Sequence, residues 1–212
     1  MADSSHMHTP EPSNEGLDGI VRDPDELLRQ LHGQPPDRRQ LWVFGYASLI
    51  WRPEFDAAER RMARVHGWHR ALRMRSRVNR GTPERPGLVY ALLPGGSCRG
   101  MVFRLQPEHA EQDLRRLWAR EMPFAVYDPR WLPCRTELGV VPALAFTLSR
   151  RHESHVGRLP DVQMLEILRH ARGRYGTTLE YLAETARALR EHGVGDRETE
   201  RLMALARRHG LV

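Results

Sequence analysis

Strand-like and helical patterns are segregated along this chain, and their order limits the folds open to it. Strand character is concentrated in the first two thirds of the sequence, whereas apolar residues recur with helical spacing over residues 160–173, 177–192 and 196–208. One helical segment, 107–121, is inserted among the strands. Because parallel α/β sheets need alternating strands and helices, this order predicts an α+β fold with a mixed or mainly antiparallel sheet curled into a small barrel.

The expected strands are short apolar runs bounded by turn-forming residues. Pro94-Gly95-Gly96-Ser97 separates two of these runs and predicts a hairpin turn, and Gly67 predicts a bulge or bend within a third run. No GxGxxG motif follows the first strand, which argues against a dinucleotide-binding fold. The expected strands cover residues 41–44, 65–75, 88–93, 98–105, 124–127, 131–136 and 140–148.

The chain divides into a tail, a short helical segment and one domain. Residues 1–20 contain a stretch typical of a cloning scar, and we expect them to form a disordered tail. Residues 21–40 hold a short helix, which Asp23 caps and which ends at Leu31, followed by a linker. Residues 41–212 are expected to form a single domain, since compact domains hold about 100–200 residues.

The basic residues of this chain are interleaved with acidic ones. All 33 basic residues are arginine, 27 are acidic, and the formal net charge is +6. No run of five basic residues occurs, and no aromatic-rich RNA-binding motif accompanies the charge. We therefore expect a solvated charged surface and no nucleic-acid partner, although an anionic small molecule would need only one or two of these guanidinium groups.

Composition also bears on the compartment. No apolar run approaches the roughly 18 residues needed to span a bilayer, and no secretory signal is visible at the start of the chain. Cys98 and Cys134 are too few for a disulfide framework and are typical of reduced thiols. The sequence therefore predicts a soluble cytoplasmic protein with no membrane partner.

Two histidine pairs invite a metal-site interpretation that their spacing disfavours. His152 and His155 are one residue short of the HExxH spacing, and His66 and His69 would lie on opposite faces of a strand. Ser48 is a conceivable nucleophile, but its surroundings lack the GxSxG pattern. We expect no metal site at either histidine pair.

The stretch LWVFGYASLIWRP interrupts what would otherwise be a buried strand. After the apolar residues 41–44 come Gly45, Tyr46, Ala47 and Ser48, before apolar character resumes over 49–51. Such a break is either a tight turn inside the core or a place where exposed backbone groups hold a ligand.

Glu121 lies where the inserted helix should be buried. It is spaced four residues from Leu117 and three from Trp118, and it lies in the last turn, where the helix macrodipole disfavours an anion. Burial and the dipole both raise the pKa of a carboxyl group, toward the range of a general base. The alternative is a frayed helix end where Glu121 pairs at the surface with Arg75 or Arg120. The predicted apolar stripe consists of Ala110, Leu114, Leu117 and Trp118.

An ordered set of motifs across residues 41–208 resembles the ChaC family, the glutathione-specific γ-glutamylcyclotransferases. The first motif is Val43-Phe44-Gly45-Tyr46-Ala47-Ser48-Leu49-Ile50-Trp51. Later motifs are His66-Gly67-Trp68-His69-Arg70, Arg75-Ser76, Asn79-Arg80-Gly81-Thr82-Pro83-Glu84-Arg85-Pro86-Gly87, Gly95-Gly96-Ser97-Cys98-Arg99-Gly100, Leu117-Trp118-Ala119-Arg120-Glu121-Met122, Gly157-Arg158-Leu159-Pro160 and Glu180-Tyr181-Leu182.

The resemblance implies a γ-glutamylcyclotransferase-like α+β barrel and an enzyme that cleaves glutathione to 5-oxoproline and cysteinylglycine without metal or organic cofactor. It implies that Glu121 is the general base. It further implies that the loop after the first strand binds substrate, and Arg75 is our candidate for contact with a substrate carboxylate. The candidate substrate-binding residues are Val43, Phe44, Gly45, Tyr46, Ala47, Ser48, Leu49 and Arg75.

The sequence departs from the family pattern at two positions. Ala47 stands where the family has Gly, which would be costly if that position needs a positive φ, and His155 stands where the family pattern leads us to expect a Tyr. Two alternatives therefore stay open. The chain could be a cyclotransferase for another γ-glutamyl amine or dipeptide, or a γ-glutamyl-binding protein in which Ala47 has disabled turnover.

Overall fold

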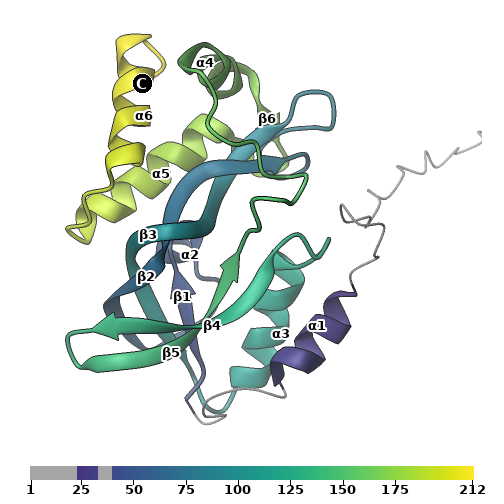
Figure 1. Cartoon of the computed structure of the whole chain (residues 1–212), viewed down its shortest axis with the longest axis vertical. Helices are drawn as coiled ribbons and strands as arrows, with labels where there is room; N and C mark the ends of the chain where they lie inside the picture. Colours follow the sequence, from purple (N-terminus) through teal and green to yellow (C-terminus); the bar gives the residue numbers. More distant parts are fainter. Residues whose placement is uncertain (1–22, 33–39) are drawn as a thin grey trace, which may run out of the picture.

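The computed structural model describes residues 23–32 and 40–212. Helices gather at both ends of a small barrel, with α4, α5 and α6 at one end and α1 and α3 at the other (Figure 1). The helices are α1 (Pro24–His32), α2 (Ser48–Trp51), α3 (Ala110–Glu121), α4 (Asp161–His170), α5 (Thr178–Glu191) and α6 (Arg197–Arg208). The strands are β1 (Trp42–Gly45), β2 (Ala57–Ser76), β3 (Gly87–Leu105), β4 (Asp128–Thr136), β5 (Gly139–Thr147), β6 (Arg172–Gly173) and β7 (Gly176–Thr177).

Five strands close into a barrel in the order β1-β3-β2-β4-β5, with β3 and β5 also in contact. β1 pairs antiparallel with β3 and parallel with β5, where Val43 lies opposite Leu144. The sheet is therefore mixed but mainly antiparallel, and the predicted α+β barrel with an inserted helix and C-terminal helices is confirmed. A closed barrel leaves fewer unpaired strand edges than an open sheet.

The expected hairpin at Pro94–Ser97 is wrong, because these residues lie within one continuous strand. β2 and β3 pair along nearly their whole length, and the chain reverses at residues 77–86 instead. Gly95 and Gly96 have φ values of +100° and +74°, and they lie opposite the predicted bulge at Gly67. These glycines therefore allow the paired strands β2 and β3 to bend at the same place. A glycine-rich composition is typical both of such a bend and of a chain reversal, so it does not tell the two apart.

One other expected strand is wrong. Residues 124–127 were expected to form a strand but form a turn after α3, and Ala125 adopts a φ of 48°. Residues 49–51, whose apolar character was left without an assigned element, belong to the short helix α2. Short apolar runs are ambiguous between strand and helix, and here the tertiary packing decides.

Both faces of β1 are buried, against different parts of the molecule. Phe44 belongs to a cluster that joins the barrel to α4, α5 and α6, and it is fully buried. Val43, on the opposite face because side chains alternate along a strand, belongs to the cluster that joins the barrel to α1 and α3. The loop that follows β1 therefore starts from a rigid position between two cores.

The predicted helices correspond to α1, α3, α4, α5 and α6, with ends that differ by a few residues. In α1, the backbone N–H of Asp25 donates to the carboxylate of Asp23 at 2.8 Å, as expected for a helix start. The expected tail, residues 1–20, and part of the 21–40 segment lie outside the described residues. Within the described ranges, no helix is long and apolar enough to cross a membrane.

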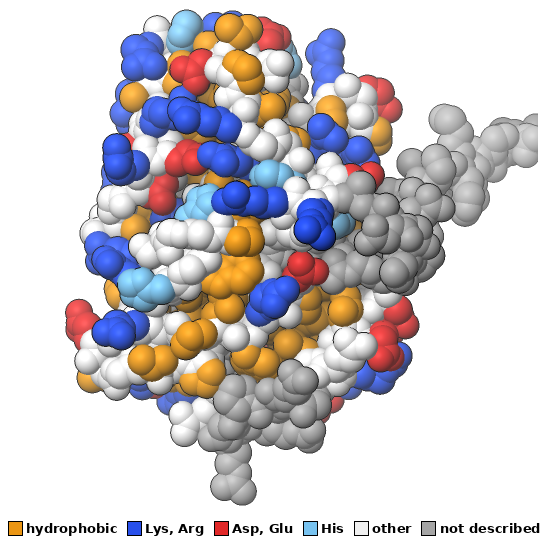
Figure 2. Space-filling model, in the orientation of Figure 1, with side chains coloured by type: hydrophobic (Ala, Val, Ile, Leu, Met, Phe, Trp, Pro, Cys, Tyr) orange, Lys and Arg blue, Asp and Glu red, His pale blue; other side chains and the backbone are white. Residues whose placement is uncertain are grey.

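The charged surface has the interleaved character that the sequence predicts. On the face drawn in Figure 2, arginine side chains are scattered among acidic and apolar ones. Many of them form ion pairs within or between helices, such as Arg190 with Glu200 at 2.8 Å. Exposed pairs of this kind contribute little to stability, about 0–1 kcal/mol each.

Candidate active site

The loop after β1 turns sharply into α2, and Gly45 makes this turn possible. A Cβ atom at Gly45 would lie 2.8 Å from a ring carbon of Phe103 and 3.0 Å from the Cβ of Leu49. No larger residue fits this close approach without moving its neighbours. The backbone N–H of Ile50 then donates to the carbonyl of Ala47 at 2.9 Å, which closes the first turn of α2.

A small cavity lies over this loop and brings together residues from five elements and their connections. Four of its lining residues come from the loop and α2, and Glu121 comes from the last turn of α3. Glu121 therefore lies beside a segment that precedes it by more than seventy residues in the chain. The lining residues are Tyr46, Ala47, Ser48, Leu49, Tyr90, Glu121, Tyr127, Phe146 and Tyr181.

The carboxylate of Glu121 is largely buried. Its side chain is 16% exposed, and its Oε1 lies 3.1 Å from the Nε of Arg120. Burial raises the pKa of Glu121, the guanidinium of Arg120 lowers it, and the nearby carboxylate of Glu54 raises it, with a net shift above its ordinary value. The partner foreseen for a frayed helix end is thus present, but Glu121 lines a cavity and is not at an open surface. This is the electrostatic condition that suits a base at neutral pH.

The predicted stripe of α3 explains how Glu121 reaches this place. Ala110, Leu114, Leu117 and Trp118 are buried as expected, with Asp113 as an additional buried residue. Trp118 packs against Phe146, with ring centroids 6.0 Å apart. Since Glu121 continues the same helical face, the packing of α3 directs it toward the barrel.

Arg120 connects Glu121 to the loop. Its Nη2 donates to the hydroxyl of Ser48 at 3.1 Å, and its Nη1 donates to the carbonyl of Arg52 at 2.7 Å. It also pairs with Glu54 at 3.2 Å. One guanidinium therefore holds the last turn of α3 against α2 through several charge-assisted contacts.

Phenol groups form much of the remaining cavity wall. The hydroxyl of Tyr46 donates to the carbonyl of Phe146 at 3.0 Å and is also hydrogen-bonded to Tyr127. Burial, followed by the charge of Glu121, raises the pKa of Tyr46 well above its ordinary value, and burial raises the pKa of Tyr181 to about 12. These phenols stay protonated at neutral pH, so that Glu121 is the titratable group of the cavity suited to accept a proton.

Ala47 adopts a φ of −145°, outside the left-handed region that favours glycine. The conditional cost of an alanine at this position therefore does not arise from φ. Ala47 is buried, at 5% exposure, and it is one of the residues that line the cavity. The replacement of the family glycine by Ala47 therefore bears on the shape of the cavity and not on the backbone φ.

The other residues that the sequence predicted for the site do not line the cavity. Val43 and Phe44 are core residues that fix the loop, and neither is among the cavity-lining residues. Arg75 is half-buried on β2, and its backbone N–H donates to the carbonyl of Ser154. His155 bridges to β2 at Met74, and burial lowers its pKa. Neither Arg75 nor His155 lines the cavity.

Sequence reasoning missed Tyr90, Tyr127 and Phe146 as cavity residues. They come from β3, from the turn before β4, and from β5, and nothing in their spacing marks them. Tyr181 occurs in a matched motif, yet its place in the cavity follows only from the packing of α5 on the barrel. Among the described residues, no group of three or more His, Cys, Asp or Glu side chains is arranged to hold a metal ion.

Several named proteins are similar in sequence to this chain. The chain is 35% identical to the glutathione-specific γ-glutamylcyclotransferase of Escherichia coli K12, over 76% of this chain and 70% of that protein. It is 30% identical to glutathione-specific γ-glutamylcyclotransferase 1 of Homo sapiens, over 71% and 70% of the two chains. The corresponding enzyme of Schizosaccharomyces pombe is 32% identical, over 71% of this chain and 83% of its own length.

Structural comparison supports the same fold. The crystal structure of a glutathione-specific γ-glutamyl cyclotransferase from yeast matches with a TM-score of 0.73 at 22% identity, covering 81% of this chain and 97% of that one. The sequence model of the family described as ChaC-like protein matches residues 41–209, which is most of the chain. The protein described here therefore belongs to the ChaC family.

Proposed function

We propose that this protein is a γ-glutamylcyclotransferase that cleaves glutathione to 5-oxoproline and cysteinylglycine. The observation that carries the proposal is the position of Glu121, a buried carboxylate of raised pKa in the same cavity as residues 46–49. The relatives named for this activity at 30–35% identity support glutathione as the substrate.

The reaction begins with the α-amino group of the γ-glutamyl unit. At neutral pH this group is an ammonium ion, and Glu121 accepts one of its protons. The freed amine attacks the γ-carbonyl carbon, forming a new C–N bond that closes a five-membered ring. The carboxyl group of Glu121 then returns the proton to the leaving nitrogen as the old amide C–N bond breaks. Glu121, again a carboxylate, takes the second proton from the ring nitrogen and passes it to the released amine, which leaves as an ammonium ion. 5-Oxoproline and cysteinylglycine are released without added water.

Negative charge develops on the γ-carbonyl oxygen during the attack. The first N–H groups of a helix have no intrahelical acceptor, and those of Ala47 and Ser48 belong to the loop that lines the cavity. We assign them as donors to this oxygen, and removal of one such donor typically costs about 10²–10³ in kcat. A rigid loop supplies these dipoles without reorganisation.

Positioning supplies much of the remaining rate. The attack is intramolecular, so a cavity that holds the glutamyl chain folded brings amine and carbonyl together. The wall of Tyr46, Tyr127 and Tyr181 restricts that space and keeps uncharged hydroxyl groups beside the substrate. Arg75 remains a proposed contact for a substrate carboxylate, although in this structure it lies outside the cavity lining.

The direct test is incubation of the purified full-length protein with glutathione, followed by mass spectrometric detection of 5-oxoproline and cysteinylglycine. We expect both products in equal amounts. A panel of other γ-glutamyl dipeptides and γ-glutamyl amines, assayed in parallel, decides the substrate class. Turnover of a panel member but not of glutathione would replace the proposed substrate, and binding without any turnover would favour a non-catalytic role. Salt-sensitive binding to DNA or RNA would point to a different class of function.

A further inference from the structure

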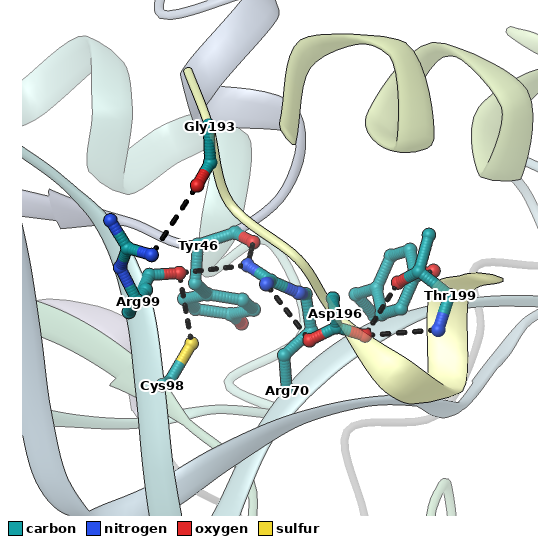
Figure 3. A network of polar contacts seen from close by, with 8 residues as sticks. Tyr46, Arg70, Cys98, Arg99, Gly193, Asp196 and Thr199 are labelled. Atoms are coloured by element: carbon teal, nitrogen blue, oxygen red, sulfur yellow. Dashed lines mark hydrogen bonds and ion pairs between the residues drawn. The ribbon is translucent and has the colours of Figure 1, made fainter. Parts of the chain in front are cut away.

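Arg70 is a charged residue buried in the core directly behind the candidate substrate loop. It lies on β2, and its side chain is 1% exposed. Its Nη1 donates to the carbonyl of Tyr46 at 2.5 Å and to the carbonyl of Arg99 at 3.2 Å. Its Nη2 donates to the carboxylate of Asp196 at 2.9 Å (Figure 3). Burying a guanidinium is costly unless it is paired and hydrogen-bonded, so the burial of Arg70 depends on these three partners.

Asp196 holds Arg70 from the start of α6. It caps this helix by accepting from the backbone N–H of Thr199 at 2.9 Å, and it accepts from the Thr199 hydroxyl at 2.8 Å. Burial raises the pKa of Asp196, but the combined effect of Arg70 and Thr199 lowers it by more, so that the pKa lies below its ordinary value. The carboxylate is therefore ionised and fixed by three donors.

The same carboxylate reaches a second wall of the cavity. The hydroxyl groups of Thr199 and Tyr90 lie 2.7 Å apart. Because the single proton of the Thr199 hydroxyl is used in the bond to Asp196, the Tyr90 hydroxyl must be the donor in this contact. Tyr90 is one of the cavity-lining residues, and its hydroxyl proton points to Thr199. Asp196 thereby orders both the loop and this ring.

The bond to the Tyr46 carbonyl determines the direction of the next N–H. The carbonyl of Tyr46 and the N–H of Ala47 belong to one planar trans peptide, in which they point in opposite directions. Arg70 lies on the carbonyl side and is absent from the cavity lining, whereas Ala47 is part of that lining. The geometry therefore directs the N–H of Ala47 toward the cavity.

We propose that Arg70 is a positioning residue, which fixes the Tyr46–Ala47 peptide so that its N–H meets the developing oxyanion, and that Asp196 of α6 holds Arg70 in place. This inference rests on the proposed function, since the oxyanion belongs to that reaction. Arg70 does not touch the substrate, so its effect reaches the reaction through the backbone dipole alone. The interaction forms mainly in the transition state, and its loss should lower kcat more than it changes KM.

Arg73 supplies a matched control within the same pair of elements. It also lies on β2 and also pairs with α6, through Glu198 at 3.2 Å, but within the described part of the chain no hydrogen bond or ion pair joins its side chain to the loop. If Arg70 only tethers α6 to the barrel, replacing either arginine should have a similar effect. If Arg70 positions the peptide, only its replacement should impair the chemical step.

The experiment compares Arg70→Met, Arg70→Lys and Arg73→Met in the full chain, at a temperature where thermal unfolding curves show each variant to be folded. We expect kcat to fall about 10²-fold in Arg70→Met, with KM within about threefold of wild type. Arg70→Lys should be intermediate, because one ammonium cannot reach both partners in the same geometry. Arg73→Met should stay within about twofold. Equal losses of kcat in Arg70→Met and Arg73→Met, or wild-type kcat in Arg70→Lys, would overturn the proposal.

A measurement without substrate separates this proposal from the proposed function. Amide hydrogen exchange over residues 46–50 should accelerate in both Arg70 variants and stay as in wild type in Arg73→Met, because Arg70, unlike Arg73, donates to the Tyr46 carbonyl. Unchanged exchange in the Arg70 variants would contradict the positioning role. If wild type fails to turn over any γ-glutamyl compound, the proposed function fails, and the exchange result still decides whether Arg70 fixes the loop.

Discussion

Two arginine–carboxylate pairs contact the loop after β1, and they hold their carboxylates in opposite electrostatic conditions. The Nη2 of Arg70 lies 2.9 Å from the Oδ2 of Asp196, and the Nε of Arg120 lies 3.1 Å from the Oε1 of Glu121. The pKa of Asp196 lies below its ordinary value, whereas the pKa of Glu121 lies above it. The distance between partners therefore does not explain the difference.

The surroundings of each carboxylate do explain it. Asp196 stands at the N-terminus of α6, where the helix dipole favours an anion, and it accepts two further hydrogen bonds from Thr199. Burial raises the pKa of Glu121 more than Arg120 lowers it, and the carboxylate of Glu54 raises it further. Glu121 also stands in the last turn of α3, where the helix dipole disfavours an anion. One carboxylate is built to stay charged and hold structure, and the other is poised to take up a proton.

Amide replacements should separate these roles most strongly. In Glu121→Gln we expect kcat for 5-oxoproline release to fall about 10²–10⁴-fold, the usual contribution of a general acid–base group. Its fold should persist. Because the folded-state pKa of Glu121 is raised, the folded protein holds this proton better than the unfolded chain, so wild type loses stability as pH rises above 4.5 through the folded pKa.

The free energy of unfolding of Glu121→Gln, measured with urea, should therefore increase relative to that of wild type as the pH rises across this range. The contribution of the Arg120 ion pair is absent in the variant, and it opposes this gain in part. A variant that keeps wild-type kcat, or whose stability relative to wild type falls steadily with rising pH, would contradict the assignment of Glu121.

Asp196→Asn should show the reverse balance, with a larger effect on stability than on chemistry. Asparagine still caps α6 but leaves the buried guanidinium of Arg70 without its anion, at a cost of about 1–3 kcal/mol in unfolding free energy. We expect kcat to stay within about tenfold of wild type, since Arg70 still contacts the Tyr46 carbonyl. The folded-state pKa of Asp196 lies below 3.8. Its contribution to the free energy of unfolding is therefore present above pH 3.8 and is lost as the pH falls through the folded-state pKa. Urea unfolding at neutral and acidic pH tests this.

Arg120→Gln should move the pH dependence of the reaction. The guanidinium lowers the pKa of Glu121, so its removal raises that pKa, and the acid limb of kcat/KM shifts to higher pH. The plateau should stay within about tenfold of wild type, because the base remains in place. A limb that stays fixed or shifts to lower pH would mean that another group titrates.

Ala47→Gly should have the smallest effect. Since the φ of −145° lies outside the left-handed region, restoring the glycine of the family removes no positive-φ cost. We expect kcat within about threefold of wild type and a loss of about 0.5–1 kcal/mol in stability, from the greater freedom of glycine in the unfolded chain. Steady-state kinetics and thermal unfolding measure both. An increase in kcat above tenfold would show instead that the methyl group crowds the substrate.

Part of this site was predictable because its signals are local. Glu121 is conspicuous as a carboxylate on an apolar helical stripe, and the break after β1 is visible as Gly45-Tyr46-Ala47-Ser48. Asp196 could be read as a helix cap, yet its partner Arg70 is 126 residues away and is one arginine among many. Long-range partners of this kind leave no spacing pattern, so the sequence offered no reason to prefer Arg70 over Arg75.

The sequence by itself determined the fold class with its C-terminal helices, the buried face of α3 and the family to which the chain belongs. These follow from hydrophobic periodicity and from short motifs, which act over one element at a time. Only the tertiary structure decided that residues 94–97 continue a strand, that residues 48–51 form the helix α2, and that Arg70 stands behind Tyr46. Each of these depends on contacts between distant segments, where packing and burial outweigh local preference.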